Sequence, residues 1–342
     1  MKGFSHLGVL RALEERGITP TVYAGSSIGA LISAAHVCGL SVSDITERAL
    51  RLRRRDLFRI NHMGMLLERT RSPSLYLEEP LRALVRSVVP HVRFDEIAKA
   101  LYVNTVDVER GTQVVWGLPG LRDVYVDDAV YASCALPVFF PPGRVDGRYC
   151  LDGGTVDNLP VSVAAREVDA IIAVDVGSTN VRRDDKVATA GFASISMRAA
   201  TVMMHALQAN LLAQWSGPPM ILIRPQVAEF GWFRFDVTAQ LIDLGYAAAS
   251  EALADFDTCL ASPAGLIYPR RLVQLAVDRA KCNGCGLCAA TAPRVMALDL
   301  QGKAFARQEV VDWSPADGEF IRHCPTGALD AKAMEPALEK AS

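Results

Sequence analysis

A serine flanked by small residues is the first place where this sequence could do chemistry. Ser27 lies in the stretch VYAGSSIGALI and completes a G-x-S-x-G pattern with Gly25 and Gly29. This pattern has a mechanical meaning on a sharp strand-to-helix turn, where small neighbours leave the serine hydroxyl accessible for nucleophilic attack. The apolar runs on both sides predict that order of elements. The following helix would also direct its N-terminal N–H groups, starting with Ile28, at a developing oxyanion.

A nucleophilic serine needs a proton acceptor. None of the six histidines lies in a late, glycine-flanked loop, so we interpret them as surface or core residues: His6, His36, His62, His91, His205 and His323. In YCLDGGTVDNLPV, however, Asp152 follows a short apolar run and precedes Gly153 and Gly154. A carboxylate can accept a serine proton directly, and glycines permit close approach of backbone or substrate. Ser27 and Asp152 are therefore a candidate dyad, with a simple turn at Asp152 as the alternative.

The C-terminal cysteines have the spacing of metal ligands. VDRAKCNGCGLCAATAP contains a C-x-x-C-x-x-C run, and a fourth cysteine precedes a proline further on; the set is Cys282, Cys285, Cys288 and Cys324. Thiolates at two-residue intervals can converge on one centre, and Gly284 and Gly286 let the backbone wrap it. We interpret the scattered Cys38, Cys134, Cys150 and Cys259 as core residues.

Composition limits the classes of protein that fit. The chain has 342 residues, of which 50% are hydrophobic and 22% charged, enough for a large domain and a smaller one. A net charge of -2 and a pI near 6.3 argue against a nucleic-acid-binding protein. No apolar run approaches the roughly 18 residues of a membrane span, and no signal peptide is recognisable. Because the cysteines suggest ligation in a reducing compartment, we expect a cytoplasmic protein.

The elements that must position these residues alternate along the chain. Helical periodicity covers 8–15, 28–39, 81–89 and 197–215, whereas 21–25, 99–108, 112–118 and 169–177 have the composition of strands. This alternation predicts an α/β fold with helices on a largely buried sheet. Composition changes after about Cys259. We expect residues 261–271 to be a linker, 272–332 a cysteine-bearing domain, and 333–342 a short helix or frayed tail.

Residues 1–255 resemble the patatin-like phospholipases. The motifs occur in the order of that family: KGFSHLGVLRALEERGI, AGSSIGALI, DDAVYASCALPVFFPP, YCLDGGTVDNLPV and AIIAVDVG. The resemblance implies a three-layer α/β/α sandwich over 1–260. It also implies that Ser27 is the nucleophile and Asp152 the general base of a lipid acyl hydrolase, supported by Lys2, Gly25, Gly29, Gly153 and Gly154. Phospholipids, lysophospholipids or other fatty acyl esters are the implied substrates.

The start of the chain departs from the family pattern. Family members have a strand and a G-G-G-x-[KR]-G loop that forms most of the oxyanion hole, and Met1, Lys2 and Gly3 align with only its last three positions. The resemblance leaves Gly3 and Ile28 as oxyanion donors and implies a gap in the central sheet. We expect the natural protein to be longer; an inactive remnant is the alternative.

Residues 270–332 resemble bacterial ferredoxins, in which three closely spaced cysteines and a remote Cys-Pro bind one [4Fe–4S] cluster. In two-cluster ferredoxins another cysteine precedes the proline after the first triplet, but here Ala292 occupies that place. The resemblance therefore implies one cluster on Cys282, Cys285, Cys288 and Cys324, with zinc as the alternative.

The segment between Arg48 and Pro90 could cover the site. It holds six arginines close together: Arg48, Arg51, Arg53, Arg54, Arg55 and Arg59. One interpretation is attraction to anionic lipid headgroups, with an apolar cap of Leu57, Phe58, Met63, Met65 and Leu66. The alternative is an amphipathic helix with a solvated basic face.

The sequence thus predicts a lipid acyl hydrolase fused to a one-cluster ferredoxin-like module that serves a redox, sensing or structural purpose. Its expected partners are a fatty acyl ester, the inner face of a membrane by peripheral contact, and a redox partner. The rival hypothesis is a catalytically impaired hydrolase fold that acts as a redox-responsive or electron-transfer binding module.

Overall fold

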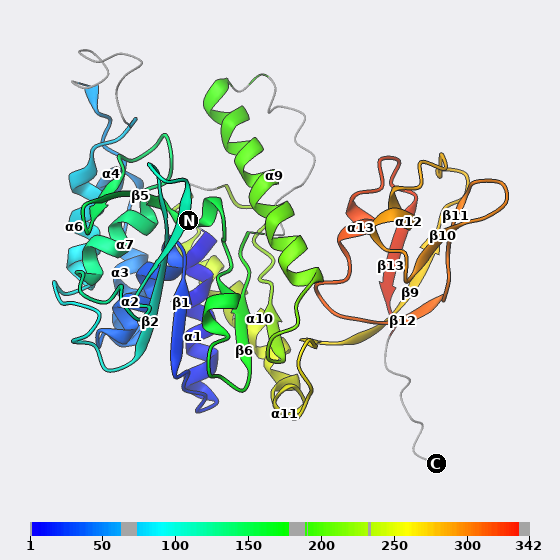
Figure 1. The fold of residues 1–342 in the computed structure, drawn as a ribbon, viewed down its shortest axis with the longest axis horizontal. Coiled ribbons are helices and arrows are strands. Elements are labelled where there is room, and N and C mark those ends of the chain that lie inside the picture. The colour runs from blue at the N-terminus through cyan, green and yellow to red at the C-terminus, as the bar shows by residue number, and fades with distance from the viewer. Residues whose placement is uncertain (1, 63–73, 178–188, 190, 232–233, 335–342) are drawn as a thin grey trace.

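The computed structural model describes residues 2–62, 74–177, 189, 191–231 and 234–334. Figure 1 shows a larger unit, coloured blue to yellow, and a smaller unit, coloured orange to red, joined by a narrow connection. The long helix α9 (Phe192–Ala213) stands on the side of the larger unit that faces the smaller one.

The first sheet of the larger unit is organised around one long strand. Its strands are β1 (Val22–Gly25), β2 (Ala100–Asp107), β3 (Thr112–Trp116), β4 (Gly143–Val145) and β5 (Arg148–Asp152). β3 pairs with β2 along 103–107, whereas the parallel β1 pairs along 100–103 and the antiparallel β5 along 105–107. Because β3 occupies one edge of β2, β1 and β5 must share the other edge. The C-terminal ends of β1 and β5 therefore face each other at the level of Asn104, which lies between their last partners on β2.

The second sheet is parallel and deeply buried. It contains β6 (Ile171–Val174), β7 (Met220–Ile223) and β8 (Ile267–Tyr268), in that order. All four residues of β7 are buried, as expected for a strand covered on both faces. β8 lies inside the segment that we expected to be a linker, because Ile267 and Tyr268 are buried and β8 pairs with β7 despite the glycine and prolines nearby.

Helices cover both sheets. They are α1 (Ser5–Glu15), α2 (Ile28–Val37), α3 (Val42–Arg51), α4 (Arg54–Leu57), α6 (Glu78–Val88), α7 (Val126–Cys134), α8 (Val161–Ala164), α9, α10 (Thr238–Ala252) and α11 (Phe256–Leu260). Short 3₁₀ turns lie at Lys2–Phe4 (η1), Gly153–Thr155 (η3) and Leu253–Asp255 (η6). The expected helices and strands are confirmed as elements, with ends shifted by a few residues.

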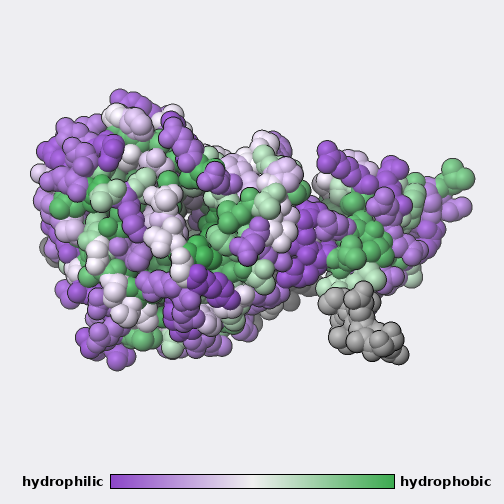
Figure 2. Space-filling model, turned by 90° about the horizontal axis from the view of Figure 1, so that it is seen from below, coloured by the Kyte–Doolittle hydropathy of each residue, from purple (hydrophilic) through white to green (hydrophobic). Residues whose placement is uncertain are grey.

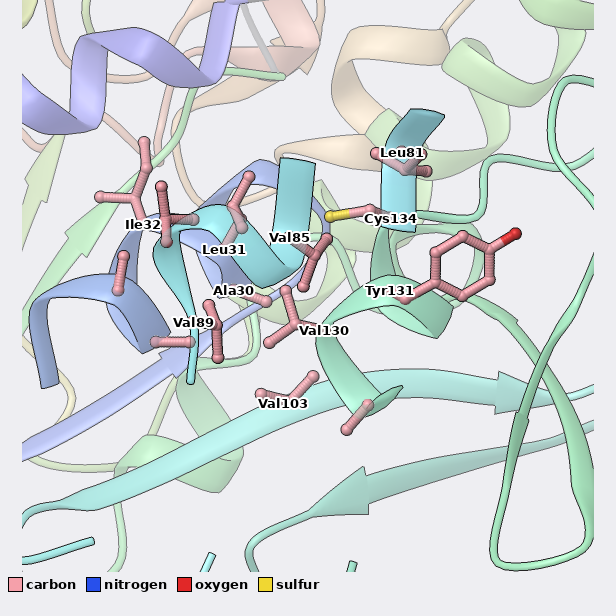
Figure 3. Close-up of a cluster of buried hydrophobic side chains, with 14 of the residues drawn as sticks. Ala30, Leu31, Ile32, Leu81, Val85, Val89, Val103, Val130, Tyr131 and Cys134 are labelled. Atoms are coloured by element: carbon pink, nitrogen blue, oxygen red, sulfur yellow. The ribbon is translucent and has the colours of Figure 1, made fainter. Parts of the chain in front are cut away.

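The main core fixes the helix that follows Ser27. Figure 3 shows Ala30 and Leu31 of α2 packed near Val85 of α6 and Val130 of α7, above Val103 of β2. All of these side chains are buried. Since burying an aliphatic side chain contributes about 1.5–3 kcal/mol, this cluster anchors α2 against the first sheet.

A cavity of about 700 Å³ separates the two sheets. All the residues of β1 and of β6 line it, and the strands lie side by side in Figure 1. Among the described residues, β1 pairs only with β2, and β6 only with β7. The facing edges of the two sheets are therefore not paired with each other.

The smaller unit has its own core. β9 (Arg271–Val277) pairs antiparallel with β12 (Val310–Trp313) and β13 (Leu329–Ala333), and β10 (Met296–Leu298) pairs with β11 (Ala304–Ala306). Two short helices, α12 (Leu287–Thr291) and α13 (Glu319–Arg322), pack against each other. Met296 and Phe320 are buried among the cysteines. Of the tail that we expected to be helical or frayed, 335–342 lie outside the described residues, while β13 reaches Ala333.

Candidate active site

Ser27 occupies the sharp turn that its sequence pattern predicts. It lies two residues after the end of β1 and is the N-cap of α2, with φ 54° and ψ −127°. A positive φ is strained for any residue with a Cβ and costs on the order of 1–3 kcal/mol. A side chain on Gly25 would lie 2.6 Å from the backbone N of Ala30, so the turn needs glycine there. The surrounding core holds the serine in this strained conformation.

Asp152 ends β5, and its carboxylate lies near enough to the Ser27 hydroxyl to interact with it. The carboxylate is almost fully buried, and its Oδ1 also accepts the Gly154 N–H at 2.8 Å. Burial raises the pKa of Asp152 to about 6, although the hydrogen bonds from Gly154 and Ser27 act in the opposite direction. The structure thus brings together two residues that lie far apart in the sequence.

Asn104 joins the two halves of the site, and sequence reasoning missed it. It is fully buried on β2, at the point where β1 and β5 face each other. Its Nδ2 donates to Ser26 Oγ at 2.9 Å, to the Gly153 carbonyl at 3.1 Å and to the Asp157 carbonyl at 2.7 Å. An asparagine in the middle of the strand-like run YVNTV was the available signal, since a buried amide must find partners.

Ser133 is a second residue that the sequence did not single out. It is fully buried near the end of α7, and its Oγ accepts the Ser27 N–H at 2.9 Å. The same hydroxyl donates to the Asn104 carbonyl at 2.7 Å. Ser133 therefore holds the backbone of the strained turn. It is hidden among the small residues of VYASCAL, which give no sign of this function.

The two expected oxyanion donors lie next to each other. A Cβ on Gly3 would fall 2.5 Å from Ile28 Cγ2, so the η1 turn packs directly against the start of α2. Within the described part of the chain, the Ile28 N–H has no recorded acceptor. His6 Nδ1 lies 2.6 Å from the Gly3 carbonyl oxygen. Burial lowers the pKa of the neighbouring Lys2 to about 8.

The remaining glycines support close contacts. A Cβ on Gly153 would lie 2.4 Å from the Asn104 carbonyl oxygen, and one on Gly154 would lie 2.8 Å from Asn158 Oδ1. Gly29 is less constrained, because a Cβ there would approach only His6, at 3.6 Å. The D-G-G sequence is thus needed for the approach of this turn to β2.

The apolar cap expected between Arg48 and Pro90 is not found in the described residues. Leu57 is buried, and Phe58 packs against Tyr76, Phe140 and Phe235. Leu57 belongs to the main core and Phe58 packs against it, which a count of apolar residues cannot reveal. Met63, Met65 and Leu66 lie outside the described residues. The six arginines are all exposed.

The four C-terminal cysteines line one small pocket of the smaller unit. The Ala304 N–H points at Cys282 Sγ at 3.5 Å, and the Ala328 N–H points at Cys324 Sγ at 3.3 Å. Gly284 and Gly286 both have positive φ, and a Cβ on Gly284 would clash with the Gly302 carbonyl at 2.5 Å. A cysteine set with backbone N–H groups directed at sulfur fits an iron–sulfur cluster.

Two further observations concern these thiols. Burial would raise the pKa of Cys324, but hydrogen bonds from Thr326, Ala328 and Gly327 outweigh it and lower the pKa below the ordinary value. Among the described residues, no group of three or more histidines, cysteines or acids has the compact geometry that holds a single metal ion. The described helices also include none with the length and apolarity to cross a bilayer.

Comparison with known proteins gives the family context of both units. Residues 1–165 match the family model described as patatin-like phospholipase. Residues 275–331 match the model described as a 4Fe-4S single cluster domain. The α/β fold class predicted from the sequence is confirmed. The two matches cover the Ser27–Asp152 site and all four pocket cysteines.

The similar curated proteins share the larger unit. An uncharacterized NTE family protein of Mycobacterium tuberculosis is 32% identical over 180 residues, which are 52% of this chain and 47% of the relative. The lysophospholipase NTE1 of Kluyveromyces lactis is 27% identical over 279 residues, 74% of this chain and 18% of the relative. This chain therefore spans about half, or less, of the length of these relatives. Among solved structures, VipD of Legionella pneumophila matches 74% of this chain and 65% of its own, with 17% identity and a TM-score of 0.38.

Proposed function

We propose that this chain is a serine-dependent lipid acyl hydrolase that uses a Ser27–Asp152 dyad. The observation that carries the proposal is the placement of the strained Ser27 beside a buried carboxylate whose pKa is about 6. A general base is most effective when its pKa lies near the working pH. The patatin-like match and the lysophospholipase name of relatives support a fatty acyl ester of phospholipid, lysophospholipid or simple ester type as substrate.

The proposed reaction has two steps. Ser27 Oγ attacks the ester carbonyl while Asp152 takes the hydroxyl proton, and the oxyanion of the tetrahedral intermediate accepts hydrogen bonds from the Ile28 and Gly3 N–H groups. Asp152 then returns the proton to the leaving alcohol, which leaves an acyl group on Ser27. In the second step Asp152 takes a proton from water, the hydroxide attacks the acyl-enzyme, and Asp152 returns the proton to Ser27 Oγ as the fatty acid departs.

The pH dependence of hydrolysis tests the identity of the base. Asp152 must be ionised to accept a proton, so kcat/KM on a soluble p-nitrophenyl acyl ester is expected to rise with pH, with a midpoint near 6, and to level off above pH 7. The midpoint is measured between pH 4.5 and 8.5, with Ser27→Ala as the blank. A midpoint near 4, or one near 8, would assign the proton transfer to another group.

For the smaller unit we propose that Cys282, Cys285, Cys288 and Cys324 hold one [4Fe–4S] cluster. The match to a 4Fe-4S single cluster domain and the N–H groups directed at Cys282 and Cys324 support this ligand set. Ester hydrolysis transfers no electron, so the cluster would serve a redox, sensing or structural purpose. The six exposed arginines near α4 support peripheral contact with an anionic membrane surface.

Metal analysis of an anaerobic preparation tests the cluster. The wild-type protein is expected to be brown, with four irons and four acid-labile sulfides per chain. Cys285→Ser is expected to lose the colour and most of the iron, while Cys259→Ser, at a buried cysteine of the larger unit, keeps both. One zinc per chain without iron would replace the cluster by a structural zinc site.

A further inference from the structure

The two units meet through a buried group of charged and polar side chains. Arg224, just after β7, forms an ion pair with Asp175 (Nε to Oδ2, 3.0 Å) and reaches Glu319 Oε1 of α13 at 3.6 Å. It also donates to the Pro315 carbonyl oxygen. His205 Nε2 of α9 lies 2.9 Å from Glu319 Oε2. These four side chains (Asp175, His205, Arg224 and Glu319) are each at most 14% exposed, so Glu319 joins the units in a largely water-free place.

On one side, this group is linked to the cluster ligands. Glu319 begins α13, and the same helix leads directly into Cys324, whose N–H donates to the Ile321 carbonyl at 3.2 Å. Phe320 anchors α13 in the core that contains Cys282 and Cys288, and α12, which carries Cys288, packs on α13. The placement of Glu319 therefore depends on the fold around the four cysteines.

On the other side, the group reaches the turn that carries Asp152. Asp175 Oδ1 accepts the Gly177 N–H at 3.0 Å, and Gly177 is so close to Asn158 that a Cβ would lie 2.7 Å from its Nδ2. Asn158 in turn contacts Gly154, whose N–H binds the Asp152 carboxylate.

A second route runs through α9. Met204, next to His205 in the chain, lies with its Cε 3.3 Å from the Cβ position of Gly154, and α9 packs on the η3 turn. Both routes end at Gly154.

We propose that Glu319, together with Arg224 and His205, is a positioning joint through which the cluster-binding unit holds the Asp152–Gly154 turn in its active geometry. The inference rests on the proposed hydrolase function. The iron–sulfur unit supports ester hydrolysis mechanically, with no electron transferred to the substrate. Loss of the cluster disorders α13 and breaks the contacts of Glu319 with Arg224 and His205. The Asp152–Gly154 turn then becomes less ordered. Removing one member of a buried charge group is costly because its partners stay buried without compensation.

A double-mutant cycle tests the joint with two readouts. The variants are Glu319→Gln, Cys285→Ser and the combination, assayed anaerobically by kcat and KM on a soluble acyl ester and by hydrogen exchange of a peptide that contains Gly154. Each single change is expected to lower kcat about 3- to 30-fold with little change in KM and to speed the exchange. In the Glu319→Gln background, Cys285→Ser should add almost nothing, because the joint is already broken.

The matched control is Arg271→Met. Arg271 of the smaller unit forms exposed ion pairs with Glu251 and Asp255 of the larger unit, so its loss weakens the contact between units without touching the joint. Figure 2 views the molecule from below and shows that hydrophilic residues cover the region where the two units meet on this side. We expect wild-type kcat and wild-type exchange at Gly154 for this variant.

Several results would overturn the joint. They are losses in kcat that multiply in the double variant, an equal loss in Arg271→Met, or exchange at Gly154 that is unchanged when the cluster is removed. If Glu319→Gln does not fold, Arg224→Lys takes its place in the cycle. Lysine keeps the positive charge but not the simultaneous contact of arginine with Asp175 and Glu319. If the wild-type chain hydrolyses no ester, the proposed function fails, and the exchange experiment still decides whether cluster and turn are coupled.

Discussion

Asp152→Asn is expected to lower hydrolysis about 10²- to 10⁴-fold and at the same time to stabilise the fold above pH 6. The folded-state pKa of Asp152 is raised from 3.8 to about 6 by burial, so the folded protein pays a free-energy cost to hold the carboxylate ionised. Two pKa units correspond to about 3 kcal/mol at neutral pH. An asparagine removes this cost and keeps an oxygen for the Gly154 N–H.

The difference in unfolding free energy between the wild type and the variant depends on pH. The wild-type protein loses stability as pH rises from about 4 through 6, because the buried carboxyl must then ionise; the variant does not. Urea unfolding at pH 4 and pH 8 measures the difference, which should be small at pH 4 and about 2–3 kcal/mol in favour of the variant at pH 8. A variant that is less stable than wild type at pH 8 would contradict the argument.

Asp157→Asn is the matched control. Asp157 lies on the same turn, and burial raises its pKa too, but its carboxylate binds the Leu159 N–H and Gln113 instead of Ser27. We expect it to keep most of its turnover. A comparable loss of hydrolysis in both variants would mean that the turn, and not the Asp152 carboxylate, is what the reaction needs.

Ser27→Ala and Ser27→Gly are expected to be equally inactive and unequally stable. Both remove the nucleophile, so turnover should fall about 10⁴-fold or more. Alanine keeps the strain of a positive φ, whereas glycine relieves it, at the cost of extra freedom in the unfolded chain. We expect Ser27→Gly to be about 1 kcal/mol more stable than Ser27→Ala.

Thermal unfolding of the two variants, together with labelling by a fluorophosphonate probe, gives the measurement. The probe should modify wild-type Ser27 and neither variant. Ser26→Ala serves as the control, because Ser26 Oγ donates to the Asp157 carbonyl and takes no part in the proposed attack. Labelling that persists in Ser27→Ala would move the nucleophile to another residue.

The sequence motifs were enough to predict the turns that carry Ser27 and Asp152, because a strand-to-helix turn and a D-G-G turn are local features. The residues that bring them together could not be found in this way. Asn104 and Ser133 act through contacts between segments 78 and 106 residues apart, which depend on the pairing of β2 with two other strands. The same limitation explains Leu57, Phe58 and β8. Whether an apolar residue forms a surface cap, a linker or a core depends on where the chain returns, which local composition does not contain.

The meeting of β1 and β5 on one edge of β2 also bears on how the site comes into existence. β1 and β5 do not pair with each other. Ser27 and Asp152 therefore come together only after both strands have paired with β2 in the native register. A shift of β2 by one residue would turn Asn104 to the opposite face and separate the pair. Contacts between residues so far apart in the sequence form slowly, because the chain loses the entropy of loop closure before these contacts stabilise it. We therefore expect refolding chains to acquire secondary structure well before they acquire esterase activity.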